Sequence, residues 1–196
     1  MGFYADYVDK INRALMSARV SVDGIEIDAE HGMRRWCDLT HALREAAGTI
    51  FFIGNGASAS MASHMSADAC KNGGLRCSCF NEISLLTAIA NDVSYDQAFA
   101  VPLRRFGRAG DILVAISSSG NSPNIVRAIE AAKDIGLQVV TLTGMSADNQ
   151  ARAGGHLNFY VPAQEYGHVE SSHQVILHSW LDQYLQEREE PRGKWG

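Results

Sequence analysis

The sequence has few cysteines and no long apolar run. Four cysteines, at positions 37, 70, 77 and 79, are too few for a disulfide scaffold in a chain of 196 residues. The Cys77-Ser78-Cys79 segment also lacks the CxxC spacing of a zinc knuckle or a redox site. No apolar stretch approaches the roughly 20 residues that a membrane helix needs, and the first residues lack the apolar core of a signal peptide. We therefore expect reduced thiols, a cytoplasmic protein and no membrane partner.

Basic residues are also scarce relative to acidic ones. There are 17 lysines and arginines against 22 aspartates and glutamates, which gives a formal net charge of -5. This balance argues against a nucleic-acid partner and against a basic membrane-surface protein. It says little about a single phosphate group, because serine hydroxyls and a helix N-terminus can hold one without any basic residue.

The pattern of apolar residues changes near residue 49. The first 48 residues carry apolar side chains at helical spacing, with a break at Val22-Asp23-Gly24, and predict an N-terminal helical extension over residues 1–48. β-Prone runs then alternate with helical stretches, which is typical of a parallel sheet covered on both faces over residues 49–187. The last residues, 188–196, are expected to form a tail, and the whole chain to fold as one unit. The expected strands are 49–53, 75–80, 111–116, 138–142 and 156–161, and the expected helices beyond residue 48 are 58–70, 83–90, 96–106, 122–135 and 169–187.

Two of the expected strands end in turns that suit a phosphate group. Gly54-Asn55-Gly56-Ala57-Ser58 allows close backbone approach in front of a helix N-terminus, although any strand-to-helix turn needs small residues. The second turn, residues 117–124 (SSSGNSPN), supplies four serines where a helix cap needs one hydroxyl, and Pro123 suits the first helical position. Neither turn has the GKS/T of a P-loop, so the pattern indicates a phosphorylated small molecule rather than a nucleotide hydrolase.

Histidines and acids are grouped at helical spacing in two places. His64 and Asp68 lie four residues apart, and Glu170, His173, Gln174 and His178 lie on the last expected helix. Such groups can hold a divalent metal such as Zn²⁺, act as acid and base, or be a solvated face or a hydrogen-bonded core histidine. Glu170 and His178 are separated by about 12 Å along a helix, so one compact site would need an irregular helix, converging side chains or a second chain.

With these residues in view, the chain resembles the SIS (sugar isomerase) domain family and, within it, the phosphoheptose isomerase group. The resemblance covers the chain to about residue 187. The segments that carry it are GNGAS (54–58), SHMSAD (63–68), LLTAIANDVSYDQAF (85–99), GDILVAISSSGNSPNIVRAIEAAK (110–133), VVTLTG (139–144) and the helix with Glu170, His173 and His178.

The resemblance implies a three-layer α/β/α sandwich with a five-stranded parallel sheet and added N-terminal helices. It also implies a homotetramer with its active site at a subunit interface. Enzymes of the group convert sedoheptulose 7-phosphate to a heptose 7-phosphate through an enediol(ate), for the heptose of surface glycans such as lipopolysaccharide. The matching phosphate contacts are Ser58, Ser117, Ser118, Ser119 and Ser122; the sugar contacts are Asn55, Gly56, Ala57, Asn91, Asp92 and Glu170; the zinc ligands are His64, Asp68, Glu170 and His178; and the catalytic groups are Asp68 and His178, with Glu170 as the alternative base.

Three positions depart from the pattern of the family. Asp68 stands for the usual glutamate, Glu170 for a glutamine, and Gly167 for an acidic residue. These departures leave open an isomerase for a different phosphosugar in a specialised pathway. A non-catalytic SIS protein that binds a phosphosugar as a regulator is the other alternative, because a fold alone does not settle function.

Overall fold

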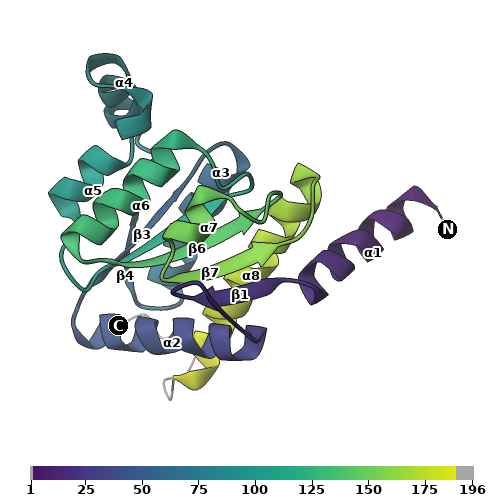
Figure 1. Ribbon diagram of the computed structural model, residues 1–196. Coiled ribbons are helices and arrows are strands. Elements are labelled where there is room, and N and C mark those ends of the chain that lie inside the picture. Colours follow the sequence, from purple (N-terminus) through teal and green to yellow (C-terminus); the bar gives the residue numbers. More distant parts are fainter. Residues whose placement is uncertain (1, 189–196) are drawn as a thin grey trace.

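A computed structural model describes residues 2–188, which form one seven-stranded sheet flanked by helices (Figure 1). The strand order is β2-β1-β7-β6-β5-β3-β4. The strands are β1 (Arg19–Val22), β2 (Ile25–Ile27), β3 (Thr49–Gly54), β4 (Arg76–Cys79), β5 (Ile112–Ser117), β6 (Gln138–Gly144) and β7 (Leu157–Val161). The helices are α1 (Phe3–Met16), α2 (Ala29–Glu45), α3 (Ala57–Lys71), α4 (Ile83–Asp92), η1 (Tyr95–Gln97, a 3₁₀ turn), α5 (Ala100–Phe106), α6 (Pro123–Ile135), α7 (Gln150–Gly154) and α8 (Tyr166–Glu187).

The five central strands confirm the predicted parallel sheet. β3 pairs in parallel with β4 and β5, and β6 pairs in parallel with β5 and β7. Every residue of β5 and of β7 is buried, as expected of strands that are covered on both faces. The predicted α/β sandwich is therefore correct as a fold class.

The sheet has two antiparallel strands beyond the five parallel strands predicted, and the expectation of an all-helical N-terminal extension was wrong. Residues 19–27 form a hairpin whose first strand, β1, pairs antiparallel with β7. The turn is Asp23-Gly24, and both residues have positive φ, 48° and 81°. An Asp-Gly pair between alternating apolar residues is a strong hairpin signal, because both turn residues must be left-handed. That local signal outweighs the helical spacing on either side of it.

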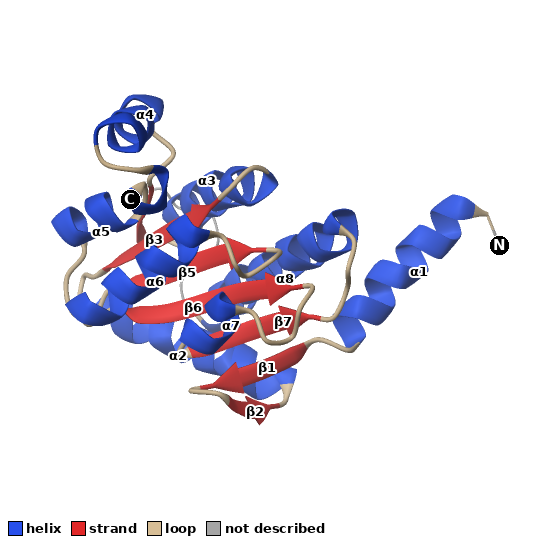
Figure 2. Ribbon diagram, turned by 45° about the horizontal axis from the view of Figure 1, so that its top comes forward, coloured by secondary structure: helices blue, strands red, loops and turns tan. Residues whose placement is uncertain are grey.

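The two faces of the sheet are covered by different helices (Figures 1 and 2). One core packs α2, α3 and α8 against the sheet, and the other packs α5, α6 and α7. In the first core Trp36 of α2 stacks on Trp180 of α8, with ring centroids 4.7 Å apart, and Trp180 donates to Thr40 Oγ1 at 3.0 Å. Trp180 thus packs between α2 and α8.

Smaller differences concern the helices of the second face. The predicted helix 96–106 is divided into η1 and α5, and the short helix α7 has no counterpart among the predicted elements. The predicted tail lies outside the described residues except for Arg188, which donates to the carbonyl of Gly73. Within residues 2–188, no helix combines the length and the apolar character that crossing a membrane requires.

Helix α1 extends away from the sheet and touches the body at the start of α8 (Figure 2). The ring of Tyr7 lies against that of His168, with centroids 4.5 Å apart. A Cβ at Gly167 would overlap the hydroxyl of Tyr7. The glycine that departs from the family pattern is therefore matched to a tyrosine on a distant part of the chain.

This contact predicts a coupling between Gly167 and Tyr7. Gly167→Ala should be less favourable by about 1–2 kcal/mol in the wild-type chain than in a Tyr7→Phe background, since only the hydroxyl causes the overlap. Urea unfolding of the four proteins of this cycle measures the difference. Equal effects of Gly167→Ala in both backgrounds would contradict the contact.

Candidate functional site

Two strand-to-helix turns meet at the carboxyl edge of the sheet. β3 and β5 are neighbours, and Gly54, the last residue of β3, pairs with Ile116 of β5. Each strand leads into a helix, α3 after β3 and α6 after β5. The carboxyl edge of an open parallel sheet is where such folds bind ligands. Both predicted phosphate turns therefore lie side by side at the expected edge.

The serine turn after β5 presents hydroxyls that the protein itself uses little. Ser117 and Ser118 are buried, and the Ser118 hydroxyl has no hydrogen-bond partner among the described residues. Ser122 occupies the N-cap position of α6, yet its side chain makes no capping hydrogen bond. Ser119 Oγ accepts only a long hydrogen bond from the amide of Asn121, at 3.3 Å. A buried hydroxyl without a partner costs free energy, which a bound acceptor at this helix N-terminus would recover.

Asn149 supports the same turn from below and was not found from the sequence. Gly120 has φ 65°, and a Cβ there would overlap the Asn149 side chain. Asn149 is 1% exposed, donates to the carbonyl of Ser146 at 2.7 Å and accepts from the amide of Arg152 at 2.8 Å. Only a glycine allows this close approach, so the serine turn rests on a fixed support.

A pair of asparagines joins the two turns. Asn55 and Asn124 exchange side-chain amide hydrogen bonds, both 2.9 Å long, and the Tyr95 hydroxyl donates to Asn55 Oδ1 at 3.1 Å. The predicted sugar contact Asn55 therefore has two partners, Asn124 and Tyr95, that the sequence analysis did not single out. The signal that could have found Asn124 is its place in the first turn of α6, directly after Pro123.

The other predicted contacts of these turns take up distinct positions. Ser58 is buried in the first turn of α3, behind Gly56 and Ala57, which are exposed. Asn91 and Asp92 are exposed at the end of α4, where Asn91 donates to Asp92 at 2.8 Å. They precede Tyr95 by a few residues, so α4 is connected to the asparagine pair through η1.

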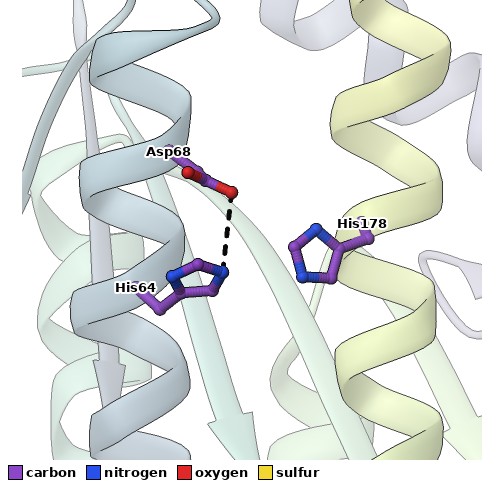
Figure 3. A group of neighbouring side chains, drawn as sticks. All are labelled: His64, Asp68 and His178. Atoms are coloured by element: carbon purple, nitrogen blue, oxygen red, sulfur yellow. Dashed lines mark ion pairs between the residues drawn. The ribbon is translucent and has the colours of Figure 1, made fainter.

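A second group of side chains lies between α3 and α8 (Figure 3). His64 and Asp68 come from α3 and His178 from α8, and one possible ligand atom of each lies within 4.8 Å of the others. His64 Nε2 is 3.5 Å from Asp68 Oδ2, and the rings of His64 and His178 have centroids 5.4 Å apart. Asp68 and His178 are half-buried and His64 is exposed, so the group is open to solvent. Two imidazoles and a carboxylate form a donor set that suits Zn²⁺ with a position left for another ligand.

The fourth predicted ligand, Glu170, is not part of this group. It lies two turns before His178 on a continuous α8, and is half-buried in the first part of that helix. The helix shows no irregularity that would shorten the separation of about 12 Å. Within the described residues, this chain therefore brings His64, Asp68 and His178 together without Glu170, and a contribution from a second chain, one of the alternatives for a four-residue set, stays a prediction.

His173, which the sequence grouped with these residues, has a structural role. It is fully buried, and its Nε2–H donates to the carbonyl of Thr143 at 3.1 Å. Desolvation lowers the pKa of His173 from 6.5 to about 4, and the hydrogen bond to Thr143 offsets a smaller part of that shift. The neutral ring fixes α8 against the end of β6. Since Thr143 pairs with Ser117, this contact also sets α8 relative to the serine turn.

Comparisons with known proteins find relatives of this chain in sequence and in fold. The family model of the SIS domain matches residues 15–144. The phosphoheptose isomerase of Thiobacillus denitrificans is 34% identical over 170 residues, which cover 83% of this chain and 84% of that protein. The structure of the phosphoheptose isomerase of Neisseria gonorrhoeae superposes with a TM-score of 0.79 at 28% identity, and covers 92% of this chain and 94% of that one. The phosphoheptose isomerase of Francisella tularensis has the same fold, with a TM-score of 0.80 at 20% identity over 95% of both chains.

The buried histidine predicts a specific pH dependence of stability. The lowered pKa of His173 means that the unfolded chain takes up a proton between pH 6.5 and about 4 and the folded chain does not, so stability falls as the pH falls through this window. The loss due to this residue should reach about 3 kcal/mol at pH 4. His173→Gln, which keeps a donor for Thr143 and cannot titrate, should show a shallower loss in urea unfolding between pH 7 and pH 4.5. An unchanged slope in this variant would contradict the assignment.

Proposed function

Because the chain belongs to the SIS-domain family and to its phosphoheptose isomerase group, we propose that it converts sedoheptulose 7-phosphate to a heptose 7-phosphate. The relatives make it a phosphosugar isomerase of heptose synthesis. The named substrate, the proton-transfer mechanism and the supply of heptose for surface glycans belong to the proposal. The observation that carries it is the presence in one chain of a serine turn with an unpartnered buried hydroxyl and of a His64–Asp68–His178 group.

The phosphate is assigned to the carboxyl edge of β3 and β5. The hydroxyls of Ser117, Ser118, Ser119, Ser122 and Ser58 would donate hydrogen bonds to it, and the backbone amides at the starts of α3 and α6 would add their partial positive charges. A dianion held in this way needs no arginine or lysine, in keeping with the net charge of the chain.

The length of the substrate fits the layout of α3. His64 lies six residues beyond Ser58 on this helix, an axial rise of about 9 Å at 1.5 Å per residue. In a seven-carbon sugar phosphate the reacting C1 and C2 are separated from the phosphate by most of the carbon chain. A site with its phosphate contacts at the start of α3 and its acid and base groups farther along suits such an extended substrate.

Zn²⁺ fits the donor set of the second group. His64, Asp68 and His178 would hold it, since two imidazoles and a carboxylate are a usual catalytic zinc set with an open position. A bound Zn²⁺ would polarise the sugar carbonyl and stabilise negative charge on its oxygen. Glu170 lies outside this group and remains available as a sugar contact or a base.

The proton moves between C1 and C2 of the sugar. We assign Asp68 as the carboxylate that removes it, which leaves a cis-enediol(ate), and His178 on the facing helix as the group that returns a proton to oxygen or carbon. Asn72 donates to Asp68 Oδ1 at 3.3 Å and leaves Oδ2 toward His64. If Asp68 and His178 are engaged as zinc ligands, neither can also move the proton, and Glu170 is then the remaining carboxylate for the proton transfer.

Exposed apolar residues support assembly as a homotetramer with the active site at a subunit interface. On α1, Phe3, Tyr4 and Met16 are 80–85% exposed, far more than a helix without a partner surface would favour. On α4, Ile83 is 75% exposed at the opposite end of the helix from the predicted sugar contacts Asn91 and Asp92. Further copies of the chain would cover both helices, and would place α4 or α1 beside a neighbouring site.

An isomerase for a different phosphosugar is the second candidate. The contact of Tyr7 with Gly167 favours it, because a tyrosine hydroxyl occupies the space of a side chain that the family pattern expects to be acidic. Asp68 and Glu170 change the reach and the charge of two further groups. These differences concern the part of the site that faces the sugar rather than the phosphate.

Incubation with sedoheptulose 7-phosphate tests the proposed reaction. The purified protein should form an aldoheptose 7-phosphate, detected by NMR or by mass-resolved chromatography, and should act at least about tenfold less well on five- and six-carbon ketose phosphates. Treatment with a chelator should abolish turnover, and added Zn²⁺ should restore it. Turnover confined to other phosphosugars would support the second candidate, whereas full turnover in chelator would remove zinc from the proposal and leave the isomerase.

Two carboxylate variants separate the candidate bases. Asp68→Asn should lower kcat by about 10²–10⁴-fold if Asp68 removes the proton, and Glu170→Gln should then retain most activity. The reverse result identifies Glu170 as the base. Asp134→Asn, an exposed change on α6, is the matched control and should behave as the wild type. Full activity in both test variants would exclude a carboxylate mechanism.

A further inference from the structure

One face of the edge strand β4 is only partly covered by helices, because Phe80 is buried in the core of α5, α6 and α7 whereas Arg76 is exposed. Side chains alternate along a strand, so Arg76, Ser78 and Phe80 project to one face, while Cys77 and Cys79 project to the other and pack against the core of α2, α3 and α8. On the face of Arg76, helix α5 ends at Phe106. β4 is the last strand of the sheet, so within residues 2–188 no further strand extends the sheet beyond it.

The partly covered face of β4 and the neighbouring part of β3 form the floor of a cavity of about 470 Å³. The register pairs Thr49 of β3 with Arg76 and Phe51 of β3 with Ser78, so all four floor residues belong to one ladder. The walls are the turn 46–48 after α2, Phe106, and the turn 108–111 before β5. These segments lie at the amino ends of β3 and β5, which is the opposite edge of the sheet from the serine turn.

Three phenylalanine rings form a row along this cavity. Phe51 and Phe80 are stacked with centroids 5.5 Å apart and planes at 19°, and Phe80 and Phe106 follow at 6.1 Å and 27°. The first two rings are buried, but Phe106 is 62% exposed. A planar ligand could therefore continue the stack on the open ring. Such a stacking contact is favourable for any of the nucleobases, because each has an aromatic face.

The charged groups of the cavity that remain open to a ligand are positive. Arg76 and Arg108 both line it, both are exposed, and within residues 2–188 neither guanidinium forms an ion pair. The carboxylate of Asp111 is the one acid of the lining, and backbone amides occupy both of its oxygens: Thr49 N–H donates to one and Arg108 N–H to the other, each at 2.8 Å. These bonds also fix the turn that presents Arg108. Two guanidinium forks then remain for an anion.

We propose that this cavity is a second ligand site, distinct from the catalytic edge, that binds a small anion carrying a planar aromatic ring, of the class of a nucleoside 5′-monophosphate. The ring lies on the exposed Phe106, the phosphate takes bidentate hydrogen bonds from Arg76 and Arg108, and the Ser78 hydroxyl is available to the sugar. The volume is in the range of small-molecule sites, and its lining combines an aromatic platform with a few polar groups, as such sites do. The assignment does not depend on the proposed isomerase reaction.

Binding of the four common nucleoside 5′-monophosphates to the full-length protein tests the proposal by calorimetry. At least one should bind in saturable fashion, and the corresponding nucleoside, which lacks the phosphate, should bind about tenfold more weakly or not at all. Arg76→Ser combined with Arg108→Ser should weaken binding by about tenfold or more, the equivalent of one charge-assisted hydrogen bond. Phe106→Trp should place a tryptophan in the stack. Bound nucleotide should then quench the tryptophan fluorescence of this variant more than that of the wild type.

Two controls separate this site from others. Arg104→Ser with Arg105→Ser removes the same charge from exposed positions of α5 outside the cavity and should leave the affinity unchanged. Ser118→Ala with Ser119→Ala alters the serine turn and should also leave it unchanged; a loss there would place the nucleotide at the catalytic edge and overturn the proposal. Absence of saturable binding to the wild type would overturn the proposal too. If the wild type binds no nucleotide and the Arg76/Arg108 variant changes its oligomeric mass, the cavity is a contact between copies of the chain.

Discussion

The packing of α3 against the sheet and against α8 is the constraint on which the rest of the site depends. The first turn of this helix supplies Ser58 to the phosphate edge, and its middle supplies His64 and Asp68 to the group with His178. Its buried residues, among them Ala62, Met65 and Ala69, fix its rotation in the core that it shares with α8. A rigid helix cannot move one end independently of the other, so the fold itself sets the separation between Ser58, a proposed phosphate contact, and His64 and Asp68, which belong to the proposed reacting group.

The position of α8 is held from the opposite side by a buried hydrogen bond. His173 donates to Thr143, and Thr143 is the register partner of Ser117, so the anchor of α8 and the serine turn share the end of one strand pair. Burial keeps this histidine neutral, which is why a residue type associated with catalysis takes no part in it here. Burial distinguishes His173 from His64, which is exposed, and from His178, which is half-buried, so these two remain candidates for the proposed chemistry.

The sequence was sufficient for the features that depend on local pattern. Apolar runs gave the five parallel strands, and glycine, serine and proline marked the two turns at the carboxyl edge. It failed where a contact joins distant segments: Asn149 beneath Gly120, Tyr7 against Gly167, and the asparagine pair across two turns. No periodicity records such contacts, because each depends on which loops the topology brings together. The hairpin at residues 19–27 is a different case, since its Asp-Gly turn was a readable local signal. Glu170 shows the converse limit: membership of a motif did not place it within reach of His178.

Helix α1 combines an exposed apolar surface with a contact to the start of α8. The same helix that exposes Phe3, Tyr4 and Met16 sets Tyr7 against the first turn of α8, three residues before Glu170. A copy of the chain that covers α1 would therefore also fix the hydroxyl that replaces a side chain at position 167. An acid at that position would have brought its own charge to this edge of the site, whereas the glycine brings none and the charge appears at Glu170 instead. The residue at 167 is thus best understood together with those at 7 and 170. The three positions redistribute polar groups around the proposed phosphate contacts, and no polar group is simply lost.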